Sequence, residues 1–261
     1  MIKLAVIGAG NLGQAIIKGL HAKLGSDCSI IATRNQIEKI QYLSCDQIEI
    51  TKDNIKAVQQ SDLIIIAVKP FKVASILEQI KPHLQTNRHI LVSVATGITT
   101  QQIAEWSNAN IPVYRAMPNT AIEICESVTC LSRHSSHSKF DSEIEDLFNH
   151  LGQSILIPED LMDAATVLGA CGIAYVLRFI RAMIQGGIEI GFDARTAANI
   201  CEQTVRGAAG LLIQNGLHPE EEIDKVTTPK GCTIRGLNEM EHQGFSSSLI
   251  KGIVSSFEKI Q

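Results

Sequence analysis

The stretch Ile2-Lys3-Leu4-Ala5-Val6-Ile7-Gly8-Ala9-Gly10-Asn11-Leu12-Gly13 decides how this chain folds. Its first half is a short apolar run typical of a buried strand, and its second half is a Gly-x-Gly-x-x-Gly pattern that opens a predicted helix at 14–21. Between strand and helix, the first glycine permits a tight turn, the second lets the backbone approach a pyrophosphate, and the third lets the helix pack closely on the strand. Open N–H groups at the helix start favour phosphate. We therefore expect a dinucleotide at this turn; a glycine-rich turn without a ligand is the alternative.

The end of the next predicted strand indicates which dinucleotide is bound. Sites that prefer NADH usually carry Asp or Glu about 20 residues beyond the glycines, where the carboxylate binds the ribose 2′-hydroxyl. Here the strand at 28–32 ends in Thr33, Arg34 and Asn35, with no acidic residue. A guanidinium can hold a 2′-phosphate through paired charge-assisted hydrogen bonds. We therefore expect NADPH, with NADH as a secondary donor; a solvated loop arginine is the alternative for Arg34.

Composition excludes several classes of protein. The chain has 261 residues, enough for one large or two modest domains with a real core. A formal net charge of -4 and an aromatic content of 4% argue against a nucleic-acid partner. There is no run of about 18 uninterrupted apolar residues, so we expect no membrane span. The first strand begins at the N-terminus, so we expect no cleaved signal.

The cysteines predict the compartment. There are seven of them, and their spacing forms neither a Cys-x-x-Cys pair nor a zinc-binding cluster. We therefore expect no metal site, and we expect reduced thiols in a cytoplasmic protein.

The first half of the chain alternates apolar strand-like runs with helical stretches. That alternation predicts a parallel, doubly wound sheet. In such sheets ligands bind beyond the carboxyl ends of the strands, so turns at those ends should share one cleft, although each taken alone could be a plain turn. The expected strands are 48–50, 62–68, 89–94, 113–117 and 127–131, and the turns are Thr33-Arg34, Val68-Lys69-Pro70, Ala95-Thr96-Gly97 and Pro118-Asn119-Thr120.

The second half changes character from about residue 160, where helical patterns replace strands. The segment 163–190 is long, apolar and rich in small residues, and a helix of this kind needs burial over most of its surface. We expect it to find that burial in an obligate homodimer; a self-contained helical bundle is the alternative. The domains are predicted at 1–158 and 159–261, with further helices at 193–214, 219–225, 234–243 and 246–259.

The segment 227–233 precedes one of these helices. It combines hydroxyl side chains, a glycine and the open N–H groups of a helix start, which suit a carboxylate. Lys230 could add a positive charge. An ordinary capped helix entry fits the same residues equally well.

With these motifs in place, the chain resembles the pyrroline-5-carboxylate reductases over nearly its whole length. The resemblance rests on a string found rarely elsewhere, Arg-Ala-Met-Pro-Asn-Thr at 115–120, together with the glycine pattern. It also rests on Ala-Val-Lys-Pro at 67–70, Val-Ser-Val-Ala-Thr-Gly at 92–97, His218-Pro219, 224–226, 229–236 and Gly244-Phe245.

This resemblance implies the reduction of L-1-pyrroline-5-carboxylate to L-proline with NAD(P)H, the last step of proline biosynthesis. It implies an N-terminal Rossmann-type domain and a C-terminal all-α dimerisation domain, assembled as a homodimer or a ring of dimers. The residues it implies for the cofactor are Ile7, Gly8, Ala9, Gly10, Asn11, Leu12 and Gly13 at the pyrophosphate, Thr33 and Arg34 at the 2′-phosphate, Asn54 near the adenosine, and Ala67, Val68, Lys69, Pro70, Ala95, Thr96 and Gly97 at the far end. Those it implies for the substrate are Asn119, Thr120, Thr228, Gly231, Cys232 and Thr233, the last near the ring nitrogen.

Two stretches depart from the family pattern, both on the substrate side. Where the family usually reads Ser-Pro-Gly-Gly-Thr-Thr, this chain has Lys230 in place of a glycine and Cys232 in place of a threonine. Where the family usually reads Ser-Gly-Ser-x-Pro-Ala-Tyr, residues 169–175 lack two hydroxyls and a proline. NADPH binding is thus better supported than the identity of the substrate.

Hydride transfer to a protonated imine needs orientation and electrostatics more than covalent help. The hypothesis is that the substrate enters as its iminium, or is protonated through a hydroxyl or water held by Thr233. His218 is interpreted as a helix-start residue.

Three alternatives remain open. They are a related imine reductase with a different substrate, a non-catalytic NADP-binding regulatory protein, and another nicotinamide enzyme on the same fold. The last usually needs a lysine or histidine on the long helix, where residues 163–190 offer Arg178 and Arg181 but neither lysine nor histidine.

Overall fold

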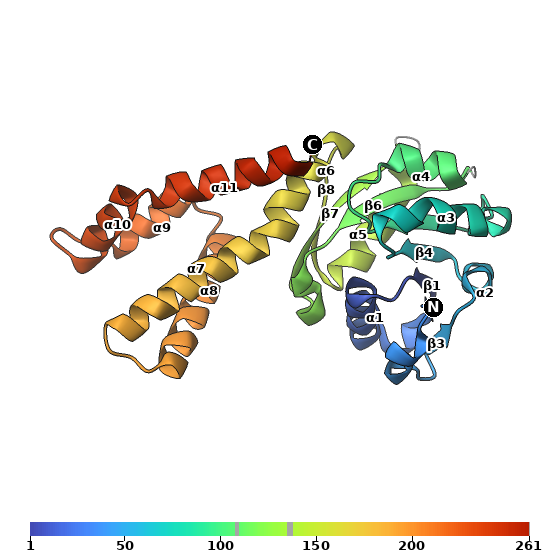
Figure 1. Ribbon diagram of the computed structural model, residues 1–261, viewed down its shortest axis with the longest axis horizontal. Helices are drawn as coiled ribbons and strands as arrows, with labels where there is room; N and C mark the ends of the chain where they lie inside the picture. Colours follow the sequence, from blue (N-terminus) through green and yellow to red (C-terminus); the bar gives the residue numbers. More distant parts are fainter. Residues whose placement is uncertain (108–109, 135–137, 261) are drawn as a thin grey trace. The chain divides into compact units, whose positions relative to one another are not determined.

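The computed structural model describes residues 1–107, 110–134 and 138–260 (Figure 1). The chain divides into two compact units, Met1–Cys171 together with Ile260, and Gly172–Lys259. The division thus follows Cys171, whereas the sequence predicts a domain boundary after residue 158.

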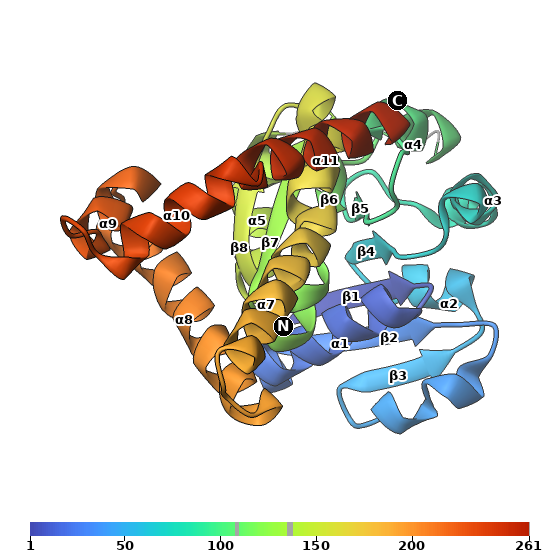
Figure 2. The same cartoon turned by 60° about the vertical axis from the view of Figure 1, so that its left-hand side comes forward.

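The N-terminal unit is built on an eight-stranded sheet in the order β3-β2-β1-β4-β5-β6-β7-β8. Figure 2 shows β1, β2 and β3 lying next to one another, in agreement with their pairing. The strands are β1 (Ile2–Ile7), β2 (Cys28–Thr33), β3 (Ile48–Thr51), β4 (Leu63–Ile66), β5 (Ile90–Ser93), β6 (Val113–Met117), β7 (Ser127–Arg133) and β8 (Gly152–Leu156).

The direction of the strands changes once. β1 to β6 pair in parallel, as predicted. β7 pairs with β6 in the antiparallel sense, so the expectation of a fully parallel sheet is wrong at this point. The reason is the connection at 118–126, which contains only the short 3-10 helix η5 (Thr120–Ile124), whereas a parallel crossover needs about a dozen residues or more. β8 was not predicted, and it extends the edge parallel to β7.

Helices cover both faces of the sheet, because alternate residues of each strand feed two separate apolar clusters. In β1, Leu4 and Val6 belong to the cluster that includes residues of α1 and α5, whereas Ala5 and Ile7 belong to the cluster that includes residues of α2, α3 and α4. The helices are α1 (Asn11–Leu24), α2 (Asn54–Gln59), α3 (Pro70–Ile80), α4 (Thr100–Ser107) and α5 (Asp141–Asn149). This two-sided burial confirms the doubly wound N-terminal fold.

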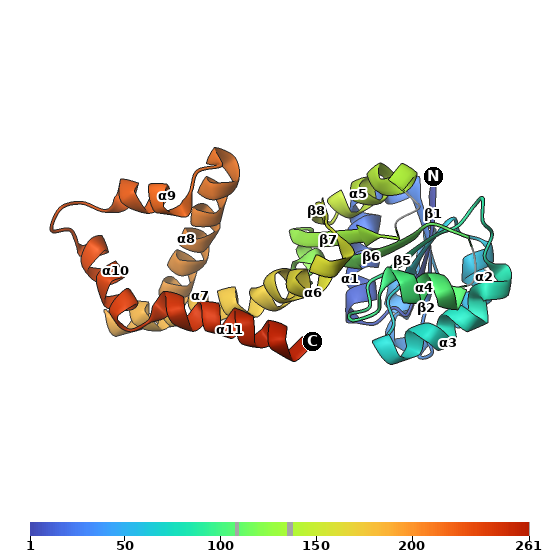
Figure 3. The ribbon, with the colours of Figure 1, turned by 90° about the horizontal axis from the view of Figure 1, so that it is seen from above.

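The predicted helix at 163–190 is present as a continuous run with three parts. α6 (Met162–Ala165) leads into a π-helical turn, Thr166–Cys171, and then into α7 (Gly172–Glu189), with which the C-terminal unit begins. The other helices of that unit confirm the predicted ones, and Figure 3 shows the connection from α9 to α10 as a wide arc. They are α8 (Ala194–Asn215), α9 (Pro219–Val226), α10 (Cys232–His242) and α11 (Phe245–Ile260).

The C-terminal unit has little interior of its own. Among its described residues, only Ala197 and Cys201 are buried. Within the described chain, the helical run Glu159–Glu189 is long and apolar enough, by length and composition alone, to cross a membrane, and 6% of its most apolar window is buried. A helix that packs against a second subunit passes the same test, so this property alone does not show a membrane span.

Candidate cofactor and substrate sites

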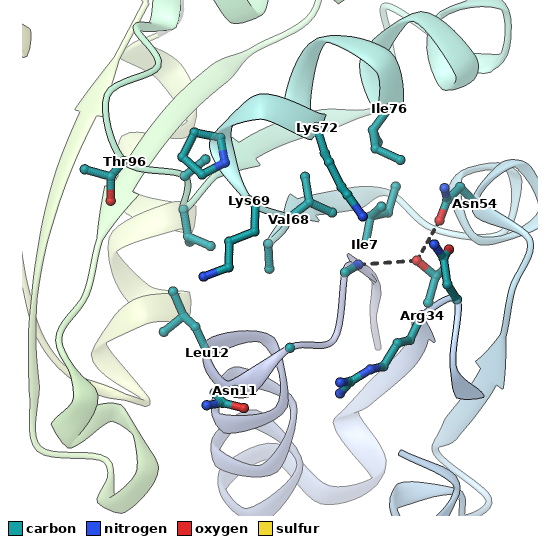
Figure 4. Close-up of a pocket in the computed structure, with 18 of the residues that line it drawn as sticks. Ile7, Asn11, Leu12, Arg34, Asn54, Val68, Lys69, Lys72, Ile76 and Thr96 are labelled. Atoms are coloured by element: carbon teal, nitrogen blue, oxygen red, sulfur yellow. Dashed lines mark hydrogen bonds between the residues drawn. The ribbon is translucent and has the colours of Figure 1, made fainter. Parts of the chain in front are cut away.

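A cavity of about 870 Å³ opens at the carboxyl ends of β1, β2, β4 and β5. This is the place where a doubly wound sheet binds its ligands. Figure 4 shows its walls, to which strand ends, the glycine turn (residues 8–13) and α3 contribute. The lining residues are Ile7, Gly8, Gly10, Asn11, Leu12, Thr33, Arg34, Asn35, Gln36, Asn54, Ala67, Val68, Lys69, Pro70, Lys72, Ile76, Val94, Ala95 and Thr96.

The three glycines of the turn have the three separate surroundings that the sequence predicts. Gly8 has φ +95°, and a Cβ there would lie 2.5 Å from Val68 Cγ1. A Cβ on Gly13 would lie 2.9 Å from the carbonyl oxygen of Gly8, so this glycine lets α1 approach the strand. A Cβ on Gly10 would meet nothing closer than 3.9 Å. The space beside Gly10 is therefore open toward the cavity, as a pyrophosphate needs.

The start of α1 is open to an anion. Gly10 is the N-cap, no side chain caps the helix, and no acidic residue lies in its first turn. The first N–H groups of a helix have no partner within it, and together with the helix dipole they favour phosphate. The carboxamide of Gln14 steadies the turn by donating to the carbonyl oxygens of Ala9 at 3.3 Å and Gly10 at 3.1 Å.

At the end of β2, side chains from three elements are tied together. The Thr33 hydroxyl donates to Asn54 Oδ1 at 2.6 Å, and Asn54 Nδ2 donates to Gln79 Oε1 at 2.9 Å. The half-buried Arg34 donates from Nη1 to the Ala9 carbonyl oxygen at 2.8 Å. The guanidinium is thereby held next to the glycine turn with further N–H groups left for a ligand.

The charge of the cavity suits a polyphosphate. Its lining contains Arg34, Lys69 and Lys72, and no Asp or Glu belongs to the lining residues that the structure describes. In Figure 4, Lys69 is directed toward Leu12, and Lys72 reaches into the cavity from α3. The donor set therefore fits a dinucleotide that carries a 2′-phosphate.

Most of the residues predicted for the cofactor line this cavity. Three do not: Ala9 is buried beneath the turn, Gly13 packs against the Gly8 carbonyl, and Gly97 is exposed with φ +73°. Five lining residues were not predicted from the sequence, namely Asn35, Gln36, Lys72, Ile76 and Val94. A sequence signal could have found two of them, since Asn35 and Gln36 directly follow Arg34.

Asn119 and Thr120 lie outside this cavity. Asn119 is buried; its Oδ1 caps η5 by accepting from the Ala121 N–H at 3.0 Å, and its Nδ2 donates to the Gly169 carbonyl at 3.4 Å in the π-helical turn. Thr120 is exposed. The Asn119 side chain therefore ties β6 to the helical run that follows the sheet.

Arg115, from the same string, is buried with 3% of its side chain exposed, and it pairs with Glu159 at 2.6 Å. Glu159 also accepts the Thr100 N–H at 3.2 Å and the Ser132 hydroxyl. These contacts join α4, β6 and β7 and indicate a structural role for Arg115.

The substrate loop (residues 228–233) lies in the C-terminal unit. The Gly231 N–H donates to the Thr228 carbonyl at 2.9 Å, and Lys230 has φ +59°. With Pro229 in the second position, this is the arrangement of a type II turn. Gly231 is the N-cap of α10, which has no side-chain cap, so the N–H groups at the start of this 11-residue helix are open.

His218 is the N-cap of α9, and it forms a capping box with Glu221. Its Nδ1 accepts the Glu220 N–H at 3.3 Å. The interpretation of His218 as a helix-start residue is confirmed. All seven cysteines are free thiols, and the described residues contain no group of three His, Cys, Asp or Glu side chains placed to hold a metal ion.

Comparison with known proteins places both halves of the chain. A family model described as "NADP oxidoreductase coenzyme F420-dependent" matches residues 3–97. A second model, described as "Pyrroline-5-carboxylate reductase dimerisation", matches residues 159–261.

Relatives of known name match nearly the whole chain. Pyrroline-5-carboxylate reductase 2 of Dictyostelium discoideum is 44% identical across 98% of this chain and 91% of its own length. Pyrroline-5-carboxylate reductase 1 of the same organism is 46% identical across 98% of this chain, which spans 49% of that longer protein.

Solved structures of pyrroline carboxylate reductases also match nearly the whole chain. A pyrroline-5-carboxylate reductase from Coxiella burnetii has a TM-score of 0.91 at 25% identity, over 99% of this chain and 97% of that one. A Plasmodium falciparum pyrroline carboxylate reductase with NADP bound has a TM-score of 0.85 at 25% identity, with the same coverage. The expectations of fold class and of an NADP cofactor are confirmed, and this chain belongs to the pyrroline-5-carboxylate reductase family of NADP-binding oxidoreductases.

Proposed function

We propose that this chain reduces L-1-pyrroline-5-carboxylate to L-proline, with NADPH held in the cavity around the glycine turn. The observation that supports NADPH binding is the lining of this cavity. It has three cationic side chains and an uncapped helix start, and its described residues include no Asp or Glu. When bound, NADPH supplies the hydride for the C=N bond. The chain's own residues bind and orient the two reactants.

We assign the cofactor's phosphates to two neighbouring groups of residues. Gly10 and the first N–H groups of α1 hold the pyrophosphate, because the backbone there is open and uncapped. Thr33, Arg34 and Asn54 hold the adenosine with its 2′-phosphate, because Thr33 bonds to Asn54, Arg34 follows Thr33 directly, and all three line the same cavity. Ala67–Pro70, Ala95 and Thr96 also line that cavity, and we assign them to the far end of the cofactor.

We assign the substrate carboxylate to the substrate loop and the start of α10. One support is the open N–H groups after Gly231. A second is the turn itself, in which Lys230 adopts the left-handed backbone conformation that glycine adopts more readily. Thr233, in the first turn of α10, holds the proton or the water that reaches the ring nitrogen. Asn119 acts by positioning the backbone around it, since its side-chain oxygen and nitrogen already bond to the backbone of Ala121 and Gly169.

The substitution Thr233→Ala tests this assignment. Loss of one positioned polar group should lower kcat/KM by about 10- to 1000-fold, while the dissociation constant of NADPH stays unchanged. Thr204→Ala is the matched control, since that hydroxyl bonds the Ile200 carbonyl within α8. An unchanged kcat/KM in Thr233→Ala would contradict the role of Thr233.

Turnover by the unaltered chain decides between the alternatives. NADPH oxidation with proline formed supports the proposed reaction despite Lys230 and Cys232. Turnover only on other cyclic imines would make the chain a related imine reductase. Tight NADPH binding without turnover on any imine would make it a non-catalytic NADP-binding regulator.

The matching dimerisation domain implies an oligomer, and we propose a homodimer or a ring of dimers. Exposed apolar side chains throughout the C-terminal unit support this proposal. We also propose that the functional domains divide at 158/159, where the dimerisation match begins, and that the protein works in the cytoplasm, where its seven free thiols stay reduced.

A further inference from the structure

One wall of the cavity is a single face of α3. Lys69, the N-cap of this helix, and Lys72 and Ile76 within it all line the cavity. Gln79, one further step along the same helical face, bonds to Asn54. Residues at this spacing lie above one another on a helix, so this face of α3 borders the cavity, and in Figure 4 Lys72 lies between Lys69 and Asn54.

A 2′-phosphate needs more positive charge than Arg34 supplies. A phosphate monoester carries a charge of about -1.5 to -2 at pH 7, whereas a guanidinium carries one positive charge, and one nitrogen of Arg34 already donates to the Ala9 carbonyl. The cavity's other two cations are Lys69 and Lys72. Lys69 is directed toward Leu12 in the first turn of α1, which is the pyrophosphate end (Figure 4).

Lys72 is free to take this second role. It is exposed, and none of the ion pairs found in the described part of the chain includes it. Its Nζ lies 5.9 Å from the ring centroid of Phe71, which is near the outer limit of a cation–π contact. In Figure 4 the side chain enters the cavity on the side of Ile7 and Asn54.

Hydrogen bonds link the C-terminal part of α3 to the end of β2. Gln79 on α3 holds Asn54, and Asn54 holds Thr33, the residue next to Arg34. We propose that Lys72 is a second determinant of the preference for NADPH over NADH, its ammonium pairing with the 2′-phosphate opposite Arg34. The inference rests on the proposed placement of the 2′-phosphate at Thr33 and Arg34.

Binding measurements on the full chain test this inference without turnover. Dissociation constants for NADPH and NADH are measured by calorimetry for the unaltered chain, Lys72→Gln, Lys72→Arg and Arg34→Ala. Adenosine 2′,5′-bisphosphate and adenosine 5′-monophosphate serve as shorter probes. Lys72→Gln should weaken NADPH and the bisphosphate about tenfold, the loss of one charge-assisted contact. NADH and the monophosphate should change less than about twofold, and Lys72→Arg should restore most of the loss.

Lys81→Gln is the matched control, because Lys81 follows α3, pairs with Glu78 and does not line the cavity. If Lys72→Gln weakens NADPH and NADH equally, Lys72 serves the pyrophosphate and the inference fails. If Arg34→Ala weakens NADPH and Lys72→Gln does not, the inference fails and the proposed site stands. If Arg34→Ala also leaves NADPH binding unchanged, the proposed 2′-phosphate site itself is wrong.

Discussion

Gly8 and Gly10 stand two residues apart in one turn, yet an added methyl group would meet different surroundings at each. At Gly8 it would lie 2.5 Å from Val68 Cγ1 on a backbone with φ +95°. At Gly10 it would have room within the protein, beside the cavity in which we propose that the pyrophosphate binds. The two positions therefore separate folding from cofactor binding.

We expect Gly8→Ala to destabilise the protein and Gly10→Ala to leave its stability nearly unchanged. Strain of about 1–3 kcal/mol at Gly8 should lower Tm by about 2–4 °C for each kcal/mol. Gly10→Ala should keep Tm and weaken NADPH at least about tenfold, because the backbone no longer reaches the pyrophosphate. Thermal melts and NADPH titrations of both variants check this. Full NADPH affinity in a stable Gly10→Ala variant would contradict the assignment.

His89 makes stability depend on pH. It is buried, and desolvation, helped by the charge of Arg88, lowers the pKa of its imidazole. The unfolded chain takes up this proton near pH 6.5, so the contribution of His89 is fully present above that pH and is lost as the pH falls toward the lower folded pKa. We expect Tm to fall between pH 7.5 and 5.5, and the fall to be smaller in His89→Gln. An equal fall in both proteins would show that other groups cause it.

At the scale of elements, the turn in the substrate loop depends on a left-handed residue. Lys230 occupies it with φ +59°, a conformation that glycine adopts freely and β-branched residues resist. We expect the Lys230→Gly variant to keep the turn and to keep the kcat/KM of the unaltered enzyme. Lys230→Val should add about 1–2 kcal/mol of strain and lower kcat/KM at least about tenfold, as the loop shifts. Steady-state kinetics of the pair check this; wild-type activity in Lys230→Val would show that the turn does not position substrate.

A helix or strand could be predicted from the sequence where its apolar pattern was long and regular. Long helices and fully apolar strands such as β4 were found because burial on both faces leaves a clear signal. β8 was missed because the strand is short, and its residues 152–156 are mixed in polarity and at most half-buried. The reversal at β7 follows from the length of one connection, which an apolar pattern does not report.

The cofactor site was predictable in part, for a similar reason. Glycines and strand ends are marked in the sequence by residue type and position. Lys72 and Ile76 carry no such mark, because any surface helix has residues at that spacing. They line the cavity only because α3 packs on the face of the sheet to which β4 contributes Ile64 and Ile66. The two roles of Asn119, as a cap and as a tie to Gly169, likewise arise from tertiary contacts.

On the scale of the whole molecule, the C-terminal unit lacks a core that would hold it alone. Leu177 on α7 is 59% exposed and Val254 on α11 is 49% exposed. We expect the chain to sediment as a dimer or larger, with a Tm that rises with protein concentration. Leu177→Asp should shift it toward the monomer, whereas Gln41→Asp, an exposed position in the N-terminal unit, should not. Sedimentation of the unaltered chain as a 28.4 kDa monomer would contradict this expectation.

The cavity's three cations and open helix start have a practical consequence. Cations and open N–H groups of this kind bind any anion that carries several negative oxygens, whether or not it is part of a nucleotide. Inorganic phosphate, sulfate and citrate therefore compete for the same charges, each in proportion to its own affinity. The apparent affinity for the coenzyme will vary with the buffer anion at constant ionic strength, and values from different buffers will compare only after that competition has been measured.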